Sequence, residues 1–399
     1  MKSTLRNLLG AGALLATMLS GGSDTGLWDL GKLADPPPAE WGSRTGLVQE
    51  VHYAGEPLAG RPTRVFAYLG RPVAADPAER RPAMVLVHGG GGKAFSKWAE
   101  HWAERGYVAL AMDLAGNGPS GRLPDGGPDQ SDSVKFREFG VGEEREMWSY
   151  HAVAAVIRGN SLVRSLPDVD PERVGITGIS WGGYLTCLAA SVDPRFKVAV
   201  PVYGCGFLGD NSVWKDKSLA AMSADARGRW LALFDPGNYL GRVSCPILFL
   251  NGTTDFAYPL DSYQKSYRQV PARWRHVSVV VDLPHGHIWT FPEVDAFVDS
   301  HLRDSDPLLG LGQAKYRDGV VRSAIHGSTP VRAANLHFTT DSGPWQKRTW
   351  KTRPARIVGG AVEVELPEER PWVGYLSVTD ERGLRTSGEH FSLGIQSAR

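Results

Sequence analysis

Cysteine is scarce in this chain of 399 residues. The three cysteines, Cys187, Cys205 and Cys245, allow at most one disulfide bond and fit no zinc-binding spacing. We therefore exclude a disulfide-stapled scaffold and expect three small, buried side chains. No cluster of histidine and acidic residues has the spacing of a metal site, so neither a metal nor another cofactor is expected.

Net charge is almost absent as well. The 44 lysines and arginines balance 43 aspartates and glutamates, which leaves a formal charge of +1. Such a chain has no overall field that attracts nucleic acid or an anionic membrane surface, so we expect neither as a partner. Beyond the amino terminus, no apolar run is long enough for a membrane-spanning helix. The chain does have 42% hydrophobic residues, enough for a sizeable core, and a length typical of two or three domains.

The amino terminus has the pattern of a signal peptide. Lys2 and Arg6 precede a weakly apolar run over residues 8–19, and small residues follow. The run is too short to span a bilayer stably. Gly22 stands where a lipoprotein would need a cysteine, so a lipid anchor is not supported. We predict that residues 1–22 are removed on export to the periplasm or the exterior.

Apolar runs of strand length alternate with amphipathic helical stretches between residues 45 and 303. The runs lack polar alternation, which is typical of parallel strands buried on both faces. We predict a mostly parallel α/β sheet with helices on both faces, preceded by an extended, proline-containing linker over residues 23–44. The expected strands are 65–69, 84–88, 107–113, 174–177, 198–203, 247–251 and 277–283.

The pattern changes after about residue 306. Short alternating segments follow, separated by turn signals rich in glycine, proline and aspartate. We predict a small, all-β sandwich over residues 310–399. Two roles stay open for it: a packing domain that steadies the first one, which we favour, and a module that binds carbohydrate or a partner. The expected strands include 336–340, 362–366, 375–379 and 390–393.

A nucleophile motif follows one of the expected strands. Residues 178–182 read Gly-Ile-Ser-Trp-Gly, with an apolar strand before them and a helical stretch after them. A serine on such a sharp strand-to-helix turn needs flanking glycines to avoid steric collision, and the turn exposes its hydroxyl. We predict Ser180 as the nucleophile. A glycine-rich turn that only happens to contain a serine is the alternative.

A catalytic serine needs a base to remove its proton and a carboxylate to orient that base. In this architecture the expected chain order is serine, acid and histidine. Asp255 lies in the loop after the strand 247–250, and we predict it as the acid. Asp261, at an expected helix start, and Asp282, at a strand end, are weaker candidates.

Two histidines flank a glycine after the last expected strand. Only one of His285 and His287 can act as the base on Ser180. We favour His287, because the preceding Gly286 leaves room for a tight turn toward the serine. His285 stays open as the alternative, and the histidine that is not the base is expected to pack beside the site.

A run of four glycines, 89–92, follows His88 at the end of another expected strand. Backbone N–H groups there can approach the oxyanion of a tetrahedral intermediate. We predict one donor at Gly90 or Gly91 and a second at the N–H of Trp181, the residue after the nucleophile. The run lacks the residues that complete a phosphate-binding loop. For His88 itself we expect a structural role.

Together these motifs resemble α/β-hydrolases of the dienelactone hydrolase, acetyl xylan esterase and prolyl-oligopeptidase-related group over about residues 45–303. The resemblance rests on the His-Gly-Gly-Gly-Gly run, Gly-Ile-Ser-Trp-Gly-Gly, Asn-Gly-Thr-Thr-Asp-Phe-Ala-Tyr-Pro and Pro-His-Gly-His. It implies an α/β-hydrolase fold with Ser180, Asp255 and His287 as nucleophile, acid and base. Exported bacterial hydrolases with this two-domain layout carry an immunoglobulin-like tail. The final histidine of the group usually stands alone, whereas two stand here.

We therefore predict an exported serine hydrolase that cleaves carboxylic esters through an acyl-enzyme. Short acyl esters, such as acetyl groups on carbohydrate, are the expected substrates by analogy. One alternative is a peptidase or aminoacyl-amide hydrolase of the prolyl-oligopeptidase type, although the segment before the sheet is too short for a propeller domain. Another is a non-catalytic binding protein on a hydrolase fold. Acyl length, leaving group and oligomeric state stay open.

Overall fold

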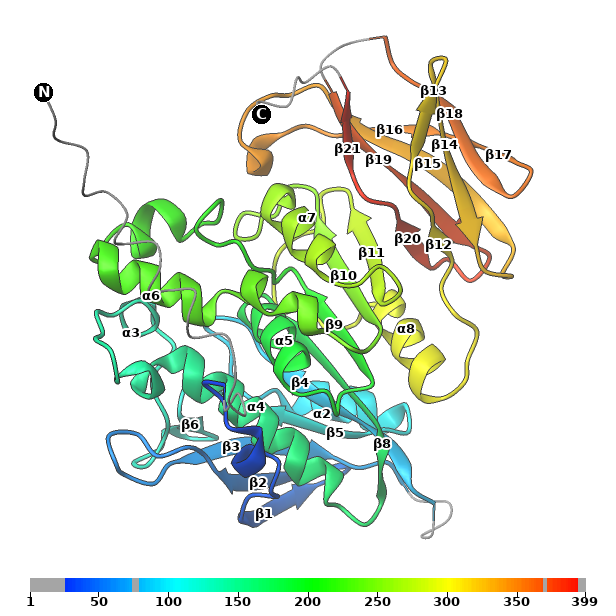
Figure 1. Ribbon diagram of the computed structural model, residues 1–399. Coiled ribbons are helices and arrows are strands. Elements are labelled where there is room, and N and C mark those ends of the chain that lie inside the picture. Colours follow the sequence, from blue (N-terminus) through cyan, green and yellow to red (C-terminus); the bar gives the residue numbers. More distant parts are fainter. Residues whose placement is uncertain (1–25, 74–78, 369–371, 394–399) are drawn as a thin grey trace, which may run out of the picture.

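The computed structural model describes residues 26–73, 79–368 and 372–393. It has two parts, a large mixed sheet with helices around it and a smaller part made of β-strands (Figure 1). The predicted signal peptide, residues 1–22, lies outside the described residues. No helix in the described ranges is long and apolar enough to cross a membrane.

The large sheet has nine strands in the order β1-β2-β3-β5-β4-β8-β9-β10-β11. The pairs from β1 to β5 are antiparallel, and all pairs from β5 to β11 are parallel. All seven strands expected before residue 303 are present, and the sheet is mostly parallel as predicted. The strands are β1 (Ala39–Thr45), β2 (Val48–Ala54), β3 (Arg64–Gly70), β4 (Arg81–Val87), β5 (Val108–Met112), β8 (Val169–Ile179), β9 (Val198–Val202), β10 (Ile247–Gly252) and β11 (Arg275–Val280).

Helices cover both faces of this sheet. The long helices α4 (Trp148–Arg164) and α5 (Trp181–Val192) lie over one face together with α7 (Leu260–Gln269), and α2 (Ser96–Glu104) and α8 (Pro292–Leu302) lie on the other (Figure 1). Strands β5, β9 and β10 are buried along their whole length because both of their faces are covered. The shorter elements are α1 (Leu30–Leu33), α3 (Asp132–Lys135), α6 (Ala224–Phe234), a hairpin of β6 (Asn117–Gly118) and β7 (Gly121–Arg122), a π-helix (Lys215–Leu219) and 3₁₀ turns at Glu144–Glu146, Pro236–Asn238, Leu240–Arg242 and Trp345–Lys347.

The prediction of a linker over residues 23–44 is wrong for the described part of that segment. Helix α1 and strand β1 both fall inside it, and β1 pairs with β2 at the edge of the sheet. Trp28 and Leu33 are buried in the core, and the Trp28 indole donates a hydrogen bond to the Tyr150 carbonyl at 3.0 Å. The prolines join two packed elements rather than two domains, since an extended proline segment also suits a short crossing over the surface.

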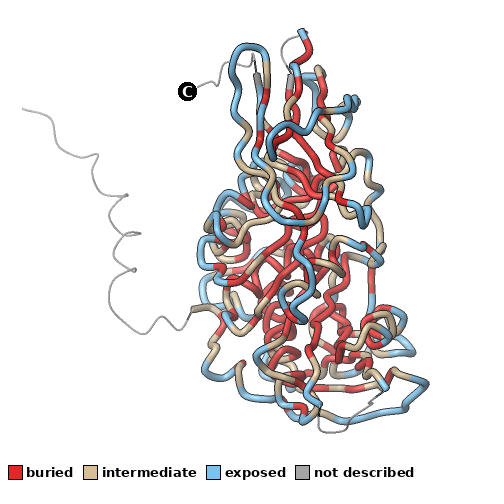
Figure 2. Tube along the Cα trace, turned by 90° about the vertical axis from the view of Figure 1, so that its right-hand side faces the viewer, coloured by how far each residue is buried: buried red, intermediate tan, exposed pale blue. Residues whose placement is uncertain are grey.

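The carboxy-terminal part is built from two antiparallel sheets. One has the order β12-β14-β18-β17 with β13 on β14, and the other has the order β16-β15-β19-β20 with β21 on β19. Their apolar side chains form a second, smaller core. The buried residues of this part are red in Figure 2. The four expected strands are present; of the others, β14 has seven residues and the rest have two to four. The strands are β12 (Gly310–Leu311), β13 (Lys315–Arg317), β14 (Val320–His326), β15 (Val331–Thr339), β16 (Lys351–Pro354), β17 (Arg356–Val358), β18 (Ala361–Glu365), β19 (Trp372–Asp380), β20 (Arg385–Ser387) and β21 (Phe391–Leu393).

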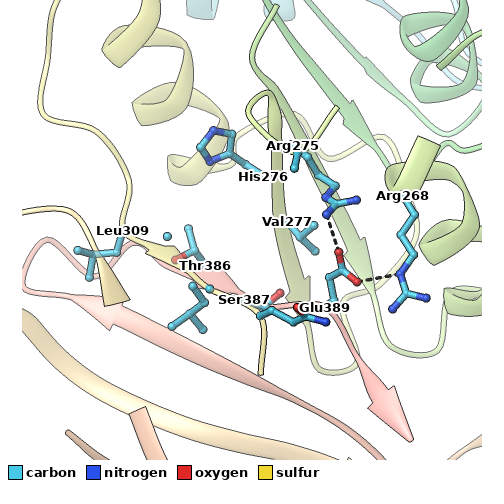
Figure 3. Close-up of a pocket in the computed structure, with 14 residues that line it drawn as sticks. Arg268, Arg275, His276, Val277, Leu309, Thr386, Ser387 and Glu389 are labelled. Atoms are coloured by element: carbon cyan, nitrogen blue, oxygen red, sulfur yellow. Dashed lines mark hydrogen bonds and ion pairs between the residues drawn. The ribbon is translucent and has the colours of Figure 1, made fainter. Parts of the chain in front are cut away.

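The two parts meet where β20 lies beside β11, the edge strand of the large sheet (Figure 1). The Val279 N–H donates to the Ser387 hydroxyl at 2.9 Å, so a buried backbone donor of the edge strand is satisfied by the other part. Glu389 accepts from Arg268 and Arg275 at 2.8 and 2.9 Å (Figure 3). A cavity of about 810 Å³ lies at this junction. Covering an edge strand in this way prevents it from pairing with other chains.

Substitution Ser387→Ala should lower the free energy of unfolding by about 1–3 kcal/mol, because it leaves the buried Val279 N–H without this acceptor. Urea titration followed by tryptophan fluorescence would measure the change. Ser342→Ala, at an exposed turn of the same part, is the matched control and should shift stability by less than about 0.5 kcal/mol. Equal effects of the two substitutions would contradict this account of the junction.

Acid should destabilise the folded chain through buried histidines. Burial lowers the pKa of His276 and His337 to about 4 and that of His390 to about 3. In the unfolded chain the pKa of these groups is about 6.5. Below that pH the unfolded state therefore binds more protons than the folded state, and the free energy of unfolding falls as the pH drops toward 4. Urea midpoints at pH 7.5, 6 and 5 would show the decline. His337→Gln should flatten it, and an unchanged slope in that variant would refute the assignment.

Candidate active site

The nucleophile candidate sits on a strained turn between β8 and α5. Ser180 has φ +58° and ψ −117°, a backbone conformation that non-glycine residues rarely adopt. A Cβ at Gly178 would lie 2.2 Å from the Gly182 carbonyl oxygen, and one at Gly182 would lie 1.9 Å from that of Val87. Both glycines are therefore required for this turn, as the sequence motif predicts.

Asp255 lies in the loop after β10, and its side chain is fully buried. One carboxylate oxygen accepts from the N–H groups of Ala257 and Tyr258 at 2.9 and 2.7 Å. The other lies 2.6 Å from Nδ1 of His285. A carboxylate held in this way fixes the ring of the histidine and leaves its Nε2 free to face the cavity.

The expectation that Asp255 orients His287 is wrong, because the contact is made by His285. The reason is the path of the loop after β11. The carbonyl of Pro284 accepts from the Tyr203 hydroxyl at 2.9 Å, which holds the residue next to it over the acid. Gly286 then carries the chain onward, so His287 lies on the glycine-run side of the cavity.

Aromatic rings enclose His285 on two sides. The Tyr203 ring stacks at 4.5 Å and 25°, and the Phe256 ring lies at 4.7 Å and 58°. Tyr203 has φ +65°, a strained backbone conformation for a non-glycine residue, at the end of β9, where its ring stacks on His285. No sequence motif marks this stacking on the histidine, which only the structure shows.

His287 and His88 meet at the carbonyl of Gly89. Nδ1 of His88 lies 2.7 Å from that oxygen, and Nε2 of His88 accepts from the Leu114 N–H at 2.9 Å, so the His88 ring has the structural role expected of it. Burial is the main cause that lowers the pKa of His287, and its hydrogen bond to Gly89 opposes the shift. A Cβ at Gly92 would lie 2.6 Å from Nε2 of His287. The two rings therefore fix the backbone of the glycine run.

A cavity of about 590 Å³ brings the candidate residues together. Ser180, His285 and His287 line it, with Gly90, Gly91 and Trp181 among its other walls. Helix α5 begins at Trp181, so the N–H of that residue has no acceptor within the helix. Gly91 has φ +70°, which a side chain would strain. The predicted oxyanion donors thus border the same space as the serine.

The remaining candidates lie elsewhere. Asp261 accepts from the Asn211 side chain, and Asp282 accepts from the hydroxyls of Thr253 and Thr254, so neither holds a histidine among the described residues. The three cysteines are buried and free, as expected. Within the part of the chain that the structure describes, no group of three or more histidine, cysteine or acidic side chains could hold a metal ion.

The sequence analysis missed four polar residues of the cavity wall, of which Asp132 and Lys135 are charged; the other two are Gln130 and Ser131. All four fall at the end of a stretch rich in glycine, proline and aspartate, where no motif marks them. Trp214 lines the cavity as well, whereas Tyr258 is fully buried behind it. The larger cavity at the domain junction shares no lining residue with this one.

Comparison with known proteins gives one family model, that of acetyl xylan esterase (AXE1), which matches residues 39–236. The acetyl esterase Axe7A of Xylanibacter ruminicola is 23% identical over 219 residues, which are 49% of this chain and 46% of that protein. The chain thus spans about half the length of the curated relatives it matches.

Solved structures show the same fold. The acetyl xylan esterase from Paenibacillus sp. R4 superposes with a TM-score of 0.54 at 20% identity, over 71% of this chain and 96% of that one. Acetyl xylan esterase 1 from Thermoanaerobacterium sp. JW/SL YS485 gives 0.51 at 19% identity, over 68% and 91%. The family match, the fold and the strand-turn-helix around Ser180 agree with one another. The chain has an α/β-hydrolase fold, and its residues 39–236 match the model of the acetyl xylan esterase family.

Proposed function

We propose that the chain is a serine hydrolase of carboxylic esters that works through a covalent acyl-enzyme. The observation that carries the proposal is the constellation in one cavity. Ser180 stands on its strained turn, and His285, bound to the buried Asp255, lines the same space. This arrangement of nucleophile, base and orienting carboxylate is what acyl transfer requires.

In the proposed reaction, the Ser180 hydroxyl oxygen attacks the ester carbonyl while Nε2 of His285 takes its proton. Asp255 accepts from Nδ1 of His285, which sets the tautomer and stabilises the imidazolium. The tetrahedral intermediate then collapses, and His285 gives the proton to the departing alkoxide. Water attacks the acyl-serine by the same proton transfers in reverse order, which releases the acid and restores the hydroxyl.

Negative charge on the carbonyl oxygen needs donors during both steps. The N–H of Trp181 and that of Gly90 or Gly91 are assigned to this task. His287, proposed from the sequence as the base, is instead assigned to holding the backbone of the glycine run through Gly89. The two histidines thus serve opposite walls of the cavity.

Acetyl and other short acyl esters on carbohydrate are the proposed substrates. The support is the matched family model and the names of three similar proteins, one acetyl esterase and two acetyl xylan esterases. The cavity adds the exposed Phe256, whose ring suits the apolar face of a sugar. Export stays a prediction from residues 1–22.

The test is to assay the purified protein in parallel on p-nitrophenyl acetate, longer p-nitrophenyl esters and an aminoacyl anilide. Ser180→Ala should lower the rate of ester cleavage by at least about 1,000-fold. The substitution keeps the Cβ, so the backbone strain at this turn and the circular dichroism spectrum should not change. Full esterase activity in this variant would contradict the mechanism. Cleavage of the anilide by the wild type as efficiently as the esters would favour the peptidase alternative.

His285→Ala and His287→Ala, assayed side by side, should separate the base from its neighbour. His285→Ala should lose about 100- to 10,000-fold in kcat, since it removes the general base. His287→Ala should lose much less, because its ring contacts the glycine run and not the acid. The assignment would be reversed if the larger loss followed removal of His287.

A further inference from the structure

A buried lysine in the cavity wall has no task in the proposed reaction. Only 4% of the Lys135 side chain is exposed, and it lies among aromatic rings. Its ammonium is 4.1 Å from the centre of the Trp181 ring and 5.6 Å from that of Trp148. Its ion-pair partner is Asp132, at 2.9 Å.

Placing an ammonium here is costly. Burial opposes the charged form and lowers the pKa of Lys135, although Asp132 favours the charge. An apolar side chain of similar volume would pack between Trp148 and Trp181 without that cost. A packing role alone therefore does not account for a lysine at this position.

The partner carboxylate faces the cavity. The Asp132 side chain is 51% exposed, and it borders the same space as Ser180. Lys135 holds one of its oxygens, and the Ser218 hydroxyl lies 3.4 Å from the other. The short helix α3 that carries both residues is anchored in turn, since the Lys135 carbonyl accepts from the Trp230 indole at 2.9 Å. Lys135 thus orients the Asp132 carboxylate, whose exposed side faces the cavity.

We propose that Asp132, oriented by Lys135, is a subsite for the free hydroxyl groups of the alcohol part of the substrate. The inference rests on the proposed esterase function. Because the ammonium already neutralises the carboxylate, the pair offers acceptor oxygens to the cavity rather than a net charge. Neighbouring hydroxyls, each both donor and acceptor, match this pattern better than an anionic group does. Phe256, exposed on the same cavity, supplies a ring for the apolar face of a pyranose.

The experiment compares two substrates in the full-length protein. One is a methyl xyloside that carries a single acetyl group and has free hydroxyls, and the other is p-nitrophenyl acetate, which has none. Asp132→Asn should lower kcat/KM for the xyloside about tenfold more than for p-nitrophenyl acetate, mostly through KM. Lys135→Met should act in the same direction, and Lys135→Arg should restore part of the loss.

The matched control is Asp216→Asn, at an exposed aspartate that borders neither cavity and should leave the ratio of the two substrates at its wild-type value. The subsite would be overturned by equal losses on both substrates in Asp132→Asn, which indicate a structural role. It would also be overturned by a wild-type enzyme that cleaves p-nitrophenyl acetate but not the xyloside. Failure of the esterase proposal looks different, since the wild type would then cleave neither ester.

Discussion

The candidate site depends on the close approach of the β8–α5 turn to the end of β4. The backbone of Gly182 comes so near the Val87 carbonyl that a single added carbon would lie 1.9 Å from it. This contact sets the serine beside the glycine run that follows β4, and it leaves no room for adjustment. Ser180 accepts an unfavourable φ as the cost of the arrangement.

The carboxyl ends of the neighbouring strands position the other residues of the site around Ser180. In a parallel sheet the carboxyl ends of neighbouring strands lie at one edge, so the loops after β4, β8, β9, β10 and β11 converge. Tyr203 at the end of β9 and Asp255 after β10 hold His285 from two sides. The site is therefore a property of the sheet order, which brings together residues far apart in the chain.

The carboxy-terminal part contacts the large sheet, and none of its described residues lines the cavity that contains Ser180. Its strand β20 covers β11, and the Val279 N–H of that edge strand finds its acceptor in Ser387. The junction has a cavity of its own, with no residue in common with the one that Ser180 lines. These contacts are those of a packing domain that steadies the first one, the role that we favour over a module that binds carbohydrate or a partner.

Much of this protein can be predicted from its sequence. The apolar runs mark the buried strands, and the glycines around Ser180 mark the turn, because backbone geometry there tolerates no other residue. Spacing cannot choose between His285 and His287, which stand two residues apart in one loop. Which of the two contacts Asp255 is decided by the tertiary structure, through the Tyr203 hydroxyl that holds the loop and the acid that lies beside it. The position of Lys135 is also decided by the tertiary structure alone, because only its packing among aromatic rings from distant parts of the chain distinguishes it from a surface lysine.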